Sequence, residues 1–344
     1  MSYYKTHDSA LFSNTIEHIQ REYLRNNLPW SLAFSGGKDS SALLKLVYLA
    51  LEELPEKTKP VTIVYCDTGV EIPIIRSSVI KTLYDLSREA VENDMPLRTQ
   101  IVRPALQDRY FSKVIGRGYP PPTFKFRWCT DVLRIKPIRS VINNTNEQSV
   151  LLLGTRKGES IERDRVLSRY KTSREYYFQQ ANSRNVVIYS PLIEYQASDI
   201  WSILRNNSMP QSIDTEKLQI LYSIVNSGHA NDLSATDILN AKGRFGCWTC
   251  TVIRHDRAVE NLIRGGEESL VPLFEFRNWL VLIRDNPSYR LKTRRNGNRG
   301  PGPFTIEARE EILDRLLEAQ SRARFNLISI EETEFIRNQW LLDS

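Results

Sequence analysis

The sequence predicts an α/β fold, with a doubly wound, mainly parallel sheet followed by a mostly helical C-terminal part. Short apolar, β-branched runs alternate with amphipathic helical patterns up to about Ser198, which is typical of a parallel sheet covered on both faces. Three polar motifs that contain glycine, at 35–40, 66–69 and 154–163, directly follow apolar runs. Because ligands bind beyond the carboxyl ends of parallel strands, the same pattern predicts one shared ligand site.

The first part of the chain supplies the expected strands and the helices between them. Apolar residues from Leu11 to Tyr23 recur at helical spacing, and Pro55 ends the helix that follows the first strand. The expected helices are 10–26, 40–54 and 72–93, and the expected strands are 29–34, 61–65, 97–102, 150–153 and 186–189.

Helical patterns dominate the remainder of the chain. The stretch 285–304 is rich in proline, glycine and arginine and is expected to be a loop. We therefore expect a nucleotide-binding α/β domain over residues 1–200 and a mostly helical region over 201–344. The helices expected there are 198–206, 212–226, 234–241, 256–264, 268–284, 305–321 and 330–341.

Composition describes a globular protein of 344 residues, with 41% hydrophobic and 26% charged residues. No run of 18 apolar residues is present, so no membrane span is expected. The first 14 residues contain no apolar segment of the signal-peptide type. We therefore expect a cytoplasmic protein whose thiols are reduced.

The net charge is +6, and its distribution along the chain is uneven. The run 116–140 carries six basic residues against the single acid Asp131, and 286–304 carries five basic residues and no acid. Each run alone is typical of a solvated surface. Two such runs beside a phosphate-binding core favour an anionic substrate, and a DNA partner is one such substrate.

The most informative motif is Ser35-Gly36-Gly37-Lys38-Asp39-Ser40, which lies between an apolar strand and an amphipathic helix. Backbone amides and the helix dipole favour a phosphate at such a turn, and glycine lets the main chain approach the ligand closely. The GxxxxGK[ST] spacing of the common P-loop is absent. The motif instead resembles the PP-loop of ATP pyrophosphatases, which cleave ATP between the α and β phosphates.

A second phosphate-recognition motif follows the strand at 150–153. Gly154 stands at the strand end, and Arg156 and Arg163 follow it. A guanidinium can pair two phosphate oxygens at once. The alternative is a surface turn whose arginines pair with Glu159 and Glu162.

The four cysteines are Cys66, Cys129, Cys247 and Cys250. The last two form a CxxC, but no second close pair supports a zinc ribbon, and a redox pair would need a strand directly before it. An iron–sulfur cluster accepts widely separated thiolates, and nearby arginines would offset its negative charge. Four unrelated thiols remain the simplest alternative.

Together these motifs resemble the adenylyl-sulfate and phosphoadenylyl-sulfate reductase family, and most closely its branch in DNA phosphorothioate modification, the Dnd/Ssp-type ATP pyrophosphatases. The motifs that carry the resemblance are SGGKDS (35–40), YCDTG (65–69), RWCTDVLRIKPI (127–138), GTRKGES (154–160) and the CxxC at 247–250. The resemblance implies a sheet of the adenine nucleotide alpha hydrolase type. It also implies ATP, Mg²⁺ and a [4Fe–4S] cluster as cofactors, and DNA and a cysteine desulfurase of the modification system as partners.

The resemblance also implies roles for individual residues. Catalytic roles fall to Lys38, Asp39, Arg156 and Arg163, and the cluster ligands would be Cys129, Cys247 and Cys250, with Cys66 as a possible fourth. The residues implied in ATP binding are Ser35, Gly36, Gly37, Lys38, Asp39, Ser40, Asp67, Gly154 and Arg156.

Two departures separate the branches of this family. Sulfonucleotide reductases carry a catalytic cysteine in a short C-terminal motif, whereas no cysteine follows Cys250 here. Cluster-bearing reductases also have a Cys-Cys pair where this chain has Trp128-Cys129. We therefore expect an enzyme that adenylates the DNA backbone phosphate for sulfur incorporation. The alternatives are a sulfonucleotide reductase of sulfate assimilation and a non-catalytic ATP-binding subunit.

Overall fold

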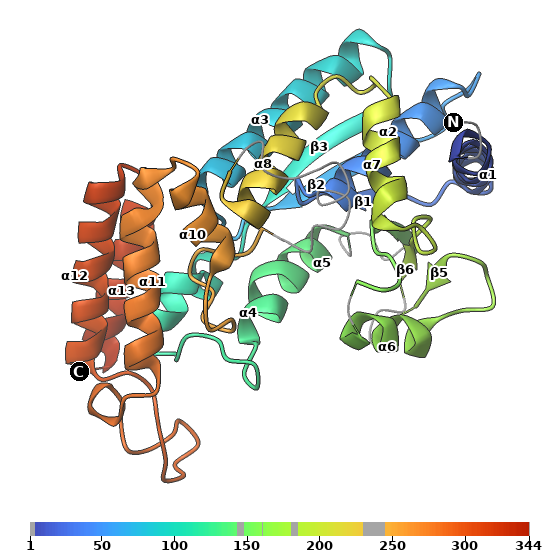
Figure 1. Ribbon diagram of the computed structural model, residues 1–344. Coiled ribbons are helices and arrows are strands. Elements are labelled where there is room, and N and C mark those ends of the chain that lie inside the picture. Colours follow the sequence, from blue (N-terminus) through green and yellow to red (C-terminus); the bar gives the residue numbers. More distant parts are fainter. Residues whose placement is uncertain (1–3, 143–147, 160, 180–184, 230–244, 344) are drawn as a thin grey trace.

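A six-stranded sheet in the order β3-β2-β1-β4-β6-β5 forms the centre of the molecule, and only β5 runs antiparallel to its neighbour (Figure 1). The structure is a computed structural model that describes residues 4–142, 148–159, 161–179, 185–229 and 245–343. The predicted α/β class with a mainly parallel sheet is confirmed. The strands are β1 Trp30–Ala33, β2 Val61–Cys66, β3 Leu97–Val102, β4 Ser149–Leu152, β5 Tyr177–Phe178 and β6 Val186–Tyr189.

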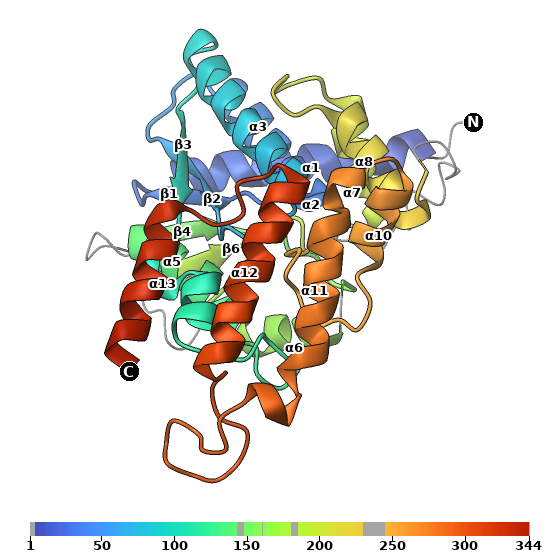
Figure 2. The same cartoon turned by 90° about the vertical axis from the view of Figure 1, so that its left-hand side faces the viewer.

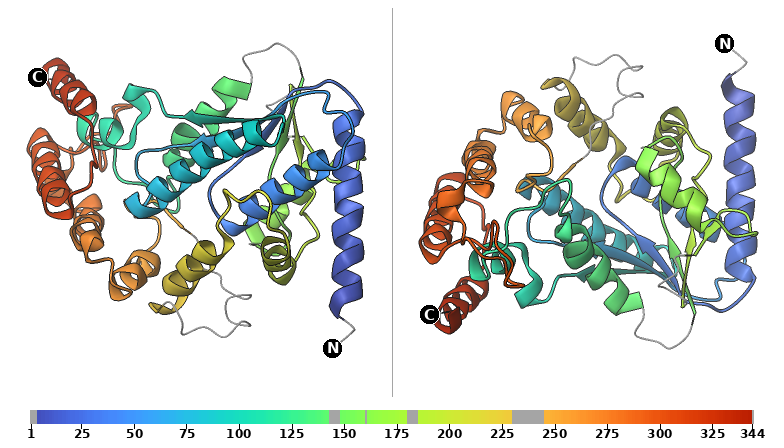
Figure 3. Two further views of the ribbon diagram at one scale, coloured as in Figure 1. Left: turned by 90° about the horizontal axis from the view of Figure 1, so that it is seen from above. Right: turned by 90° about the horizontal axis from the view of Figure 1, so that it is seen from below.

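Helices cover both faces of this sheet, as the alternating pattern predicts. In Figure 3, α2 and α3 lie over one face and α5 lies over the other, while α1 crosses one end of the sheet. Their apolar sides form the core, in which Leu32 on β1 and Leu46 on α2 are fully buried. These helices are α1 Tyr4–Leu24, α2 Lys38–Glu52, α3 Pro73–Glu92, α4 Trp128–Thr130, α5 Lys136–Ile142 and α6 Ile161–Tyr170. Short 3₁₀ and π turns at 106–108, 112–116 and 131–135 connect them.

The order of the strands places the ligand site. The chain builds outward from β1 through β2 to β3, and then returns to place β4 on the other side of β1. The carboxyl ends of β1 and β4 therefore flank the point where the strand order reverses. Ligands of open α/β sheets bind at such a point because the loops there diverge and leave a crevice.

The C-terminal part is helical, as predicted, and α11, α12 and α13 stand side by side at the end of the molecule opposite α1 (Figures 2 and 3). These helices are α7 Ala197–Asn206, α8 Thr215–Ser227, α10 Arg257–Arg264, α11 Val271–Arg284, α12 Ile306–Ala323 and α13 Ile330–Asp343. The apolar cluster of the sheet continues without interruption into these helices through Trp248 and Phe276. The boundary expected after residue 200 falls inside α7, which packs on α2.

Differences from the predicted elements are local. Strands at 97–102 and 186–189 have the predicted bounds, whereas β5 and α6 were not predicted. The helix predicted over 234–241 lies outside the described residues. No helix in the described part of the chain has the length and apolarity needed to cross a membrane.

Candidate functional site

The loop that joins β1 to α2 forms the floor of the candidate site. Gly37 is the N-cap of α2, so the amides of the first helical turn face the carboxyl edge of the sheet. The Ser40 hydroxyl accepts a hydrogen bond from the Ser35 amide at 3.2 Å and lies 3.1 Å from the Ser35 hydroxyl. The loop is therefore held in an anion-binding conformation by its own side chains.

Gly36 is required by the shape of this loop. Its φ of +72° lies in the left-handed region, and a Cβ there would stand 2.2 Å from a methyl carbon of Val79 on α3. A Gly36→Ala change is therefore expected to weaken ATP binding by at least about tenfold, because loop strain and this collision together cost about 2 kcal/mol. Calorimetric titration with ATP checks this expectation. Gly69→Ala is the control, because Gly69 also has a left-handed φ, +79°, but lies outside the loop with no atom within 4 Å of the added Cβ, so this change should leave ATP binding unaltered.

The end of β4 lies directly against the same loop. A Cβ on Gly154 would stand 2.7 Å from the carbonyl oxygen of Asp39, so only glycine allows this approach. The Arg156 guanidinium then donates to the Asp39 carboxylate and to the Tyr195 carbonyl, the latter at 3.3 Å. The two motifs that sequence analysis treated separately thus meet in one ion-pair network.

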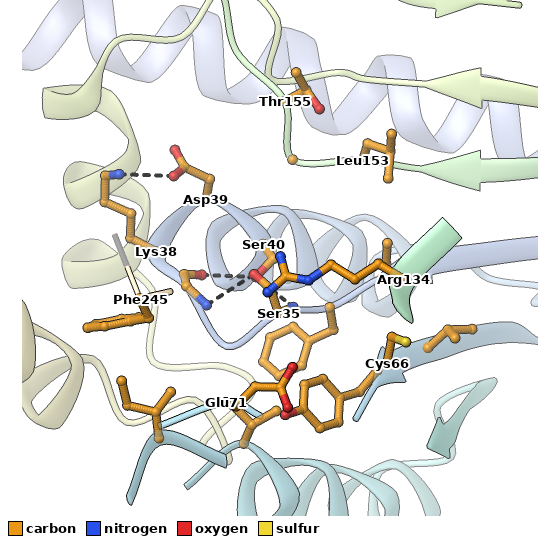
Figure 4. A pocket seen from close by; sticks show the side chains of 18 of the residues that line it. Ser35, Lys38, Asp39, Ser40, Cys66, Glu71, Arg134, Leu153, Thr155 and Phe245 are labelled. Atoms are coloured by element: carbon orange, nitrogen blue, oxygen red, sulfur yellow. Dashed lines mark hydrogen bonds and ion pairs between the residues drawn. The ribbon is translucent and has the colours of Figure 1, made fainter. Parts of the chain in front are cut away.

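Lys38 completes this network. Its ammonium lies 2.9 Å from a carboxylate oxygen of Asp39, and both side chains line a cavity of about 380 Å³ (Figure 4). Two buried cations, Lys38 and Arg156, thus share a single carboxylate. The network therefore keeps an excess of positive charge beside the loop amides, which favours an anionic ligand.

Two aromatic residues of the C-terminal part close this cavity, and sequence reasoning missed both. The Tyr222 hydroxyl on α8 accepts a hydrogen bond from the Lys38 amide at 3.2 Å, and the Lys38 ammonium lies 5.3 Å from the centre of the Tyr222 ring. Phe245 packs edge-on against that ring and also lines the cavity. At helical spacing Tyr222 is indistinguishable from a core residue, so the sequence carries no signal for this role.

Asp67, at the end of β2, lies in a neighbouring cavity of about 340 Å³ and not in the cavity of the loop. Its buried carboxylate accepts two hydrogen bonds from Arg76, both at 2.7 Å, and one from Arg103 at 2.9 Å. Burial opposes ionisation, but these hydrogen bonds outweigh it and hold the pKa of Asp67 below its usual value.

An Asp67→Asn change is expected to destabilise the fold by about 2 kcal/mol, less than a fully buried pair would cost, because both arginines are partly exposed. A depressed carboxyl pKa stabilises the folded state above the ordinary pKa near 4, and this contribution disappears as pH falls through the folded-state value. The difference in unfolding free energy between wild type and variant should therefore shrink from pH 7 toward pH 3. Urea titrations at several pH values measure it.

The cysteines lie on the side of the site nearest the C-terminal helices. The loop that carries the CxxC pairs with the segment after β2, through a bridge between Glu71 and Cys247 and a hydrogen bond from the Trp248 amide to the Val70 carbonyl at 3.0 Å. Cys129, Cys247 and Cys250 all act electrostatically on the buried Tyr110 hydroxyl. These three thiols therefore share one neighbourhood.

Cys66 and Arg134 lie between the three neighbouring thiols and the cavity that Lys38 and Asp39 line. Both line the cavity, and Figure 4 shows them with Glu71 on the side away from Lys38. The Cys66 thiol donates to the Leu133 carbonyl, and burial raises its pKa to about 12. An Arg134 nitrogen lies 3.6 Å from the Cys247 sulfur, and this neighbouring sulfur raises the pKa of Arg134. Burial raises the pKa of the Cys247 thiol itself to about 11.

The thiols fit an iron–sulfur cluster better than a single ion. Among the residues that the structure describes, no three His, Cys, Asp or Glu side chains gather closely enough to hold one metal ion. A four-iron cluster is wider than one ion, so its cysteine ligands stand farther apart. Three neighbouring thiols beside a guanidinium suit such a cluster, because the guanidinium offsets its negative charge.

The structure places the two aspartates that the resemblance implies in ATP binding, Asp39 and Asp67, differently with respect to a metal bound with ATP. Asp39 lines the loop cavity, where a metal bound with ATP would sit, whereas Asp67 is engaged by two arginines outside it. Arg163 lies on α6, and its side chain lies outside the described part of the structure.

Comparison with known proteins shows the family to which most of the chain is similar. The family model of the phosphoadenosine phosphosulfate reductase domain matches residues 29–252, which include the loop, the Gly154 motif and all four cysteines. The uncharacterized protein MJ0066 of Methanocaldococcus jannaschii is 27% identical over 205 residues, 59% of this chain and 37% of that protein. The chain therefore spans little more than a third of that relative's length.

Several solved structures resemble the fold only distantly. Phosphoadenylyl-sulfate reductase from Candida auris, solved with phosphate, shares 13% identity at a TM-score of 0.35, covering 61% of this chain and 90% of that one. FMN adenylyltransferase from Candida glabrata shares 16% identity at a TM-score of 0.37, covering 89% and 80%.

A third solved structure is the U34-tRNA thiolase NcsA from Methanococcus maripaludis with its [4Fe–4S] cluster. It shares 12% identity at a TM-score of 0.38, covering 89% of each chain. Scores this low support no argument about function. The family match is of a different kind, because it extends over most of the chain and includes every element of the loop cavity, and so the chain belongs to the phosphoadenosine phosphosulfate reductase domain family.

Proposed function

We propose that this protein is an ATP pyrophosphatase that adenylates a phosphate oxygen of the DNA backbone, so that sulfur can replace that oxygen. The observation that carries the proposal is the meeting of the 35–40 loop and the Gly154 motif around one carboxylate. Asp39 pairs there with two buried cations, Lys38 and Arg156, and lines the cavity together with Lys38. This arrangement holds a polyphosphate by amides and cations, which is what cleavage of an anhydride requires.

The chain's own residues have separable roles in this proposal. Loop amides between Ser35 and Ser40 bind the phosphates, and Lys38 moves from Asp39 to neutralise the charge that develops on leaving pyrophosphate. Arg156 keeps Asp39 in place when Lys38 leaves it, since its guanidinium is fixed by the Tyr195 carbonyl. Mg²⁺ bound with ATP would neutralise phosphate charge, with Asp39 as the carboxylate within reach. Arg163 remains a proposed phosphate ligand.

The proposed reaction consists of two displacements, neither of which changes an oxidation state. A non-bridging oxygen of the DNA phosphate attacks the α-phosphorus of ATP, the bond to the β-phosphate oxygen breaks, and pyrophosphate leaves. Hydrosulfide then attacks the DNA phosphorus, displaces AMP with the original oxygen and loses its proton to solvent. A cysteine desulfurase partner would supply the sulfur as a persulfide, which an external thiol reduces by two electrons to hydrosulfide before the second displacement. Adenylation thereby converts a poor leaving oxygen into a good one.

Cys129, Cys247 and Cys250 are the proposed ligands of a [4Fe–4S] cluster, and Arg134 lies between them and the cavity. When bound, the cluster would supply an iron at which sulfide can be held next to the reacting phosphate. Arg134 would serve both the cluster and the cavity, because its guanidinium can pair with an acceptor phosphate while it contacts the Cys247 sulfur. Cys66 is the remaining thiol at the cavity and a possible fourth ligand.

Product analysis tests the proposal. Purified protein incubated with ATP, Mg²⁺ and duplex DNA should release AMP and pyrophosphate, with transient DNA-linked AMP when sulfide is withheld. Formation of ADP in place of AMP contradicts the proposal. Release of sulfite from a sulfonucleotide would instead identify a reductase, and nucleotide binding without any product would identify a non-catalytic ATP-binding subunit.

A further inference from the structure

A basic hairpin projects from the C-terminal helices between α11 and α12, at the bottom of Figures 1 and 2. Residues 290–304, here named the basic hairpin, are closed by bridges between Arg290 and Phe304 and between Thr293 and Arg299. Its turn is ordered, because the Arg294 amide donates to the Asn298 carbonyl at 2.9 Å and Gly297 has a φ of +81°. The basic hairpin is therefore a built element and not an irregular tail.

The basic hairpin contacts residues 117–119, the segment that precedes the aromatic residues before Cys129. The Arg295 guanidinium donates to the Arg117 carbonyl and lies 5.2 Å from the centre of the Tyr119 ring. A backbone bond from Phe304 to the Gly118 carbonyl, at 2.8 Å, closes the contact. Arg290 likewise donates to backbone carbonyls at the base of the hairpin. Arg290 and Arg295 therefore stabilise the hairpin itself.

Three other cations of the basic hairpin have no such structural role. Lys292, Arg294 and Arg299 are exposed, and no carboxylate among the described residues forms an ion pair with them. Segment 286–304 contains no acid at all. Like charges held close together on a small hairpin repel one another, so these cations destabilise the hairpin when nothing is bound to it. A polyanionic partner would remove this repulsion, so the arrangement favours such a partner.

A second exposed feature lies on the same segment as the contact with the hairpin. The turn Thr123–Phe126 is closed by backbone bonds at both ends, and it presents Phe124 at 73% and Phe126 at 44% exposure. Lys125 and Arg127, both exposed, alternate with these rings. Aromatic rings interleaved with cations are typical of surfaces on which nucleic-acid bases stack. We name this segment, residues 123–127, the aromatic turn.

Hydrogen bonds join the aromatic turn, the basic hairpin and the cysteine loop into one framework. The Thr251 hydroxyl donates to the Pro122 carbonyl at 2.7 Å, and Arg284 donates to the Thr251 carbonyl at 2.8 Å. Arg290 in turn donates to the Arg284 carbonyl at 2.7 Å. The aromatic turn also leads directly into Cys129 and then Arg134, which lines the cavity, so a strand bound on this turn would lie close in sequence to a thiol and to a residue of the cavity.

We propose that the basic hairpin and the aromatic turn form a DNA-binding surface that presents the backbone to this site. Lys292, Arg294 and Arg299 contact phosphates, and Phe124 and Phe126 stack on bases. The choice of DNA rests on the proposed function, whereas the preference for a nucleic acid over a membrane does not. The tip of the hairpin, Asn296-Gly297-Asn298, carries no apolar side chain that could enter a lipid layer.

Fluorescence anisotropy at several salt concentrations, with a labelled DNA duplex that contains an unpaired stretch, tests this surface, because a ring can stack on bases only where they are unpaired. The variant K292Q/R294Q/R299Q should bind at least about tenfold more weakly at 0.1 M salt, and its log–log salt slope should fall by about three. Phe124→Ala should weaken binding by about tenfold with the slope unchanged, because stacking releases no counterions. The matched control K81Q/R88Q/R98Q removes three exposed cations from α3 and β3 and should bind as wild type.

Other outcomes overturn the inference. One such outcome is that the triple hairpin variant binds DNA with an affinity within twofold of that of the wild type and with the same log–log salt slope. The other is that binding through the hairpin is tighter to an RNA duplex or to anionic vesicles than to DNA. ATP titration of the same variants keeps the two proposals distinguishable. The hairpin variant should bind ATP normally, and Lys38→Ala should bind DNA normally. If the wild-type protein does not bind DNA but releases AMP and pyrophosphate from ATP, the proposed surface is wrong and the proposed ATP cleavage stands. If the wild-type protein binds DNA through the basic hairpin but never forms AMP, the proposed surface stands and the proposed ATP cleavage is wrong.

Discussion

Lys38→Ala is expected to lower the rate of pyrophosphate release from ATP by about 10²–10³-fold. The Lys38 ammonium belongs to the 35–40 loop, lines the cavity and lies 2.9 Å from the Asp39 carboxylate. When the anhydride bond breaks, negative charge develops on the leaving pyrophosphate. A cation that is already buried beside it needs little reorganisation to stabilise that charge. Steady-state release of pyrophosphate with DNA present measures the effect.

Lys157→Ala is the matched control for this experiment. Lys157 belongs to the Gly154 motif, but its ammonium pairs with Glu194 and is 55% exposed, away from the cavity lining. Its removal should change the rate by less than about twofold, as is usual for an exposed ion pair. If both variants behave alike, or if Lys38→Ala keeps the wild-type rate, the loop does not hold the reacting phosphates.

The central sheet could be predicted because its strands carry a local signal. Residues 97–102 and 186–189 are short, β-branched runs between turn residues, and both form strands with those bounds. The two-residue strand β5 has no such signal, because it exists only through its antiparallel pairing with β6. The hydrophobic pattern likewise did not reveal α6, because half of its ten residues are charged.

The candidate site was predictable only where one chain segment carries the chemistry. The 35–40 loop and Gly154 stood out because glycine next to a strand end marks a close backbone approach, and the structure places both at the reversal of strand order. Tyr222 and Tyr195 act through contacts that span 184 and 39 residues of sequence. Such contacts depend on how helices pack, and nothing in the local sequence distinguishes these tyrosines from core residues.

The position of Arg134 illustrates the same limit. In the sequence it is one of several basic residues in 116–140, where it was weighed only as a charge near the cysteines. In the structure it lines the nucleotide cavity and contacts the Cys247 sulfur, so it joins two motifs that are 113 residues apart. This double contact places the Cys247 thiol next to a residue of the cavity that Lys38 and Asp39 line.

Because Cys247 and Cys250 are proposed cluster ligands, substitution of either cysteine is expected to lower the iron content of the protein. Protein purified without oxygen should show the visible absorption of an iron–sulfur cluster, and Cys247→Ala or Cys250→Ala should lower bound iron and sulfide by about tenfold or more, because each removes one of three protein ligands. Colorimetric determination of iron and sulfide measures the loss.

Cys66→Ala separates cluster ligation from mere proximity. Its thiol donates a hydrogen bond to the Leu133 carbonyl and is not among the three thiols that act on Tyr110, although it interacts electrostatically with Cys247, so we expect the variant to retain iron. Retention of iron by Cys247→Ala would contradict the ligand assignment, and equal loss in Cys66→Ala would make Cys66 the fourth ligand. Because Cys66 lines the nucleotide cavity, a fourth ligand there would bring the cluster to the edge of the ATP site, and ATP binding should then perturb the cluster's absorption.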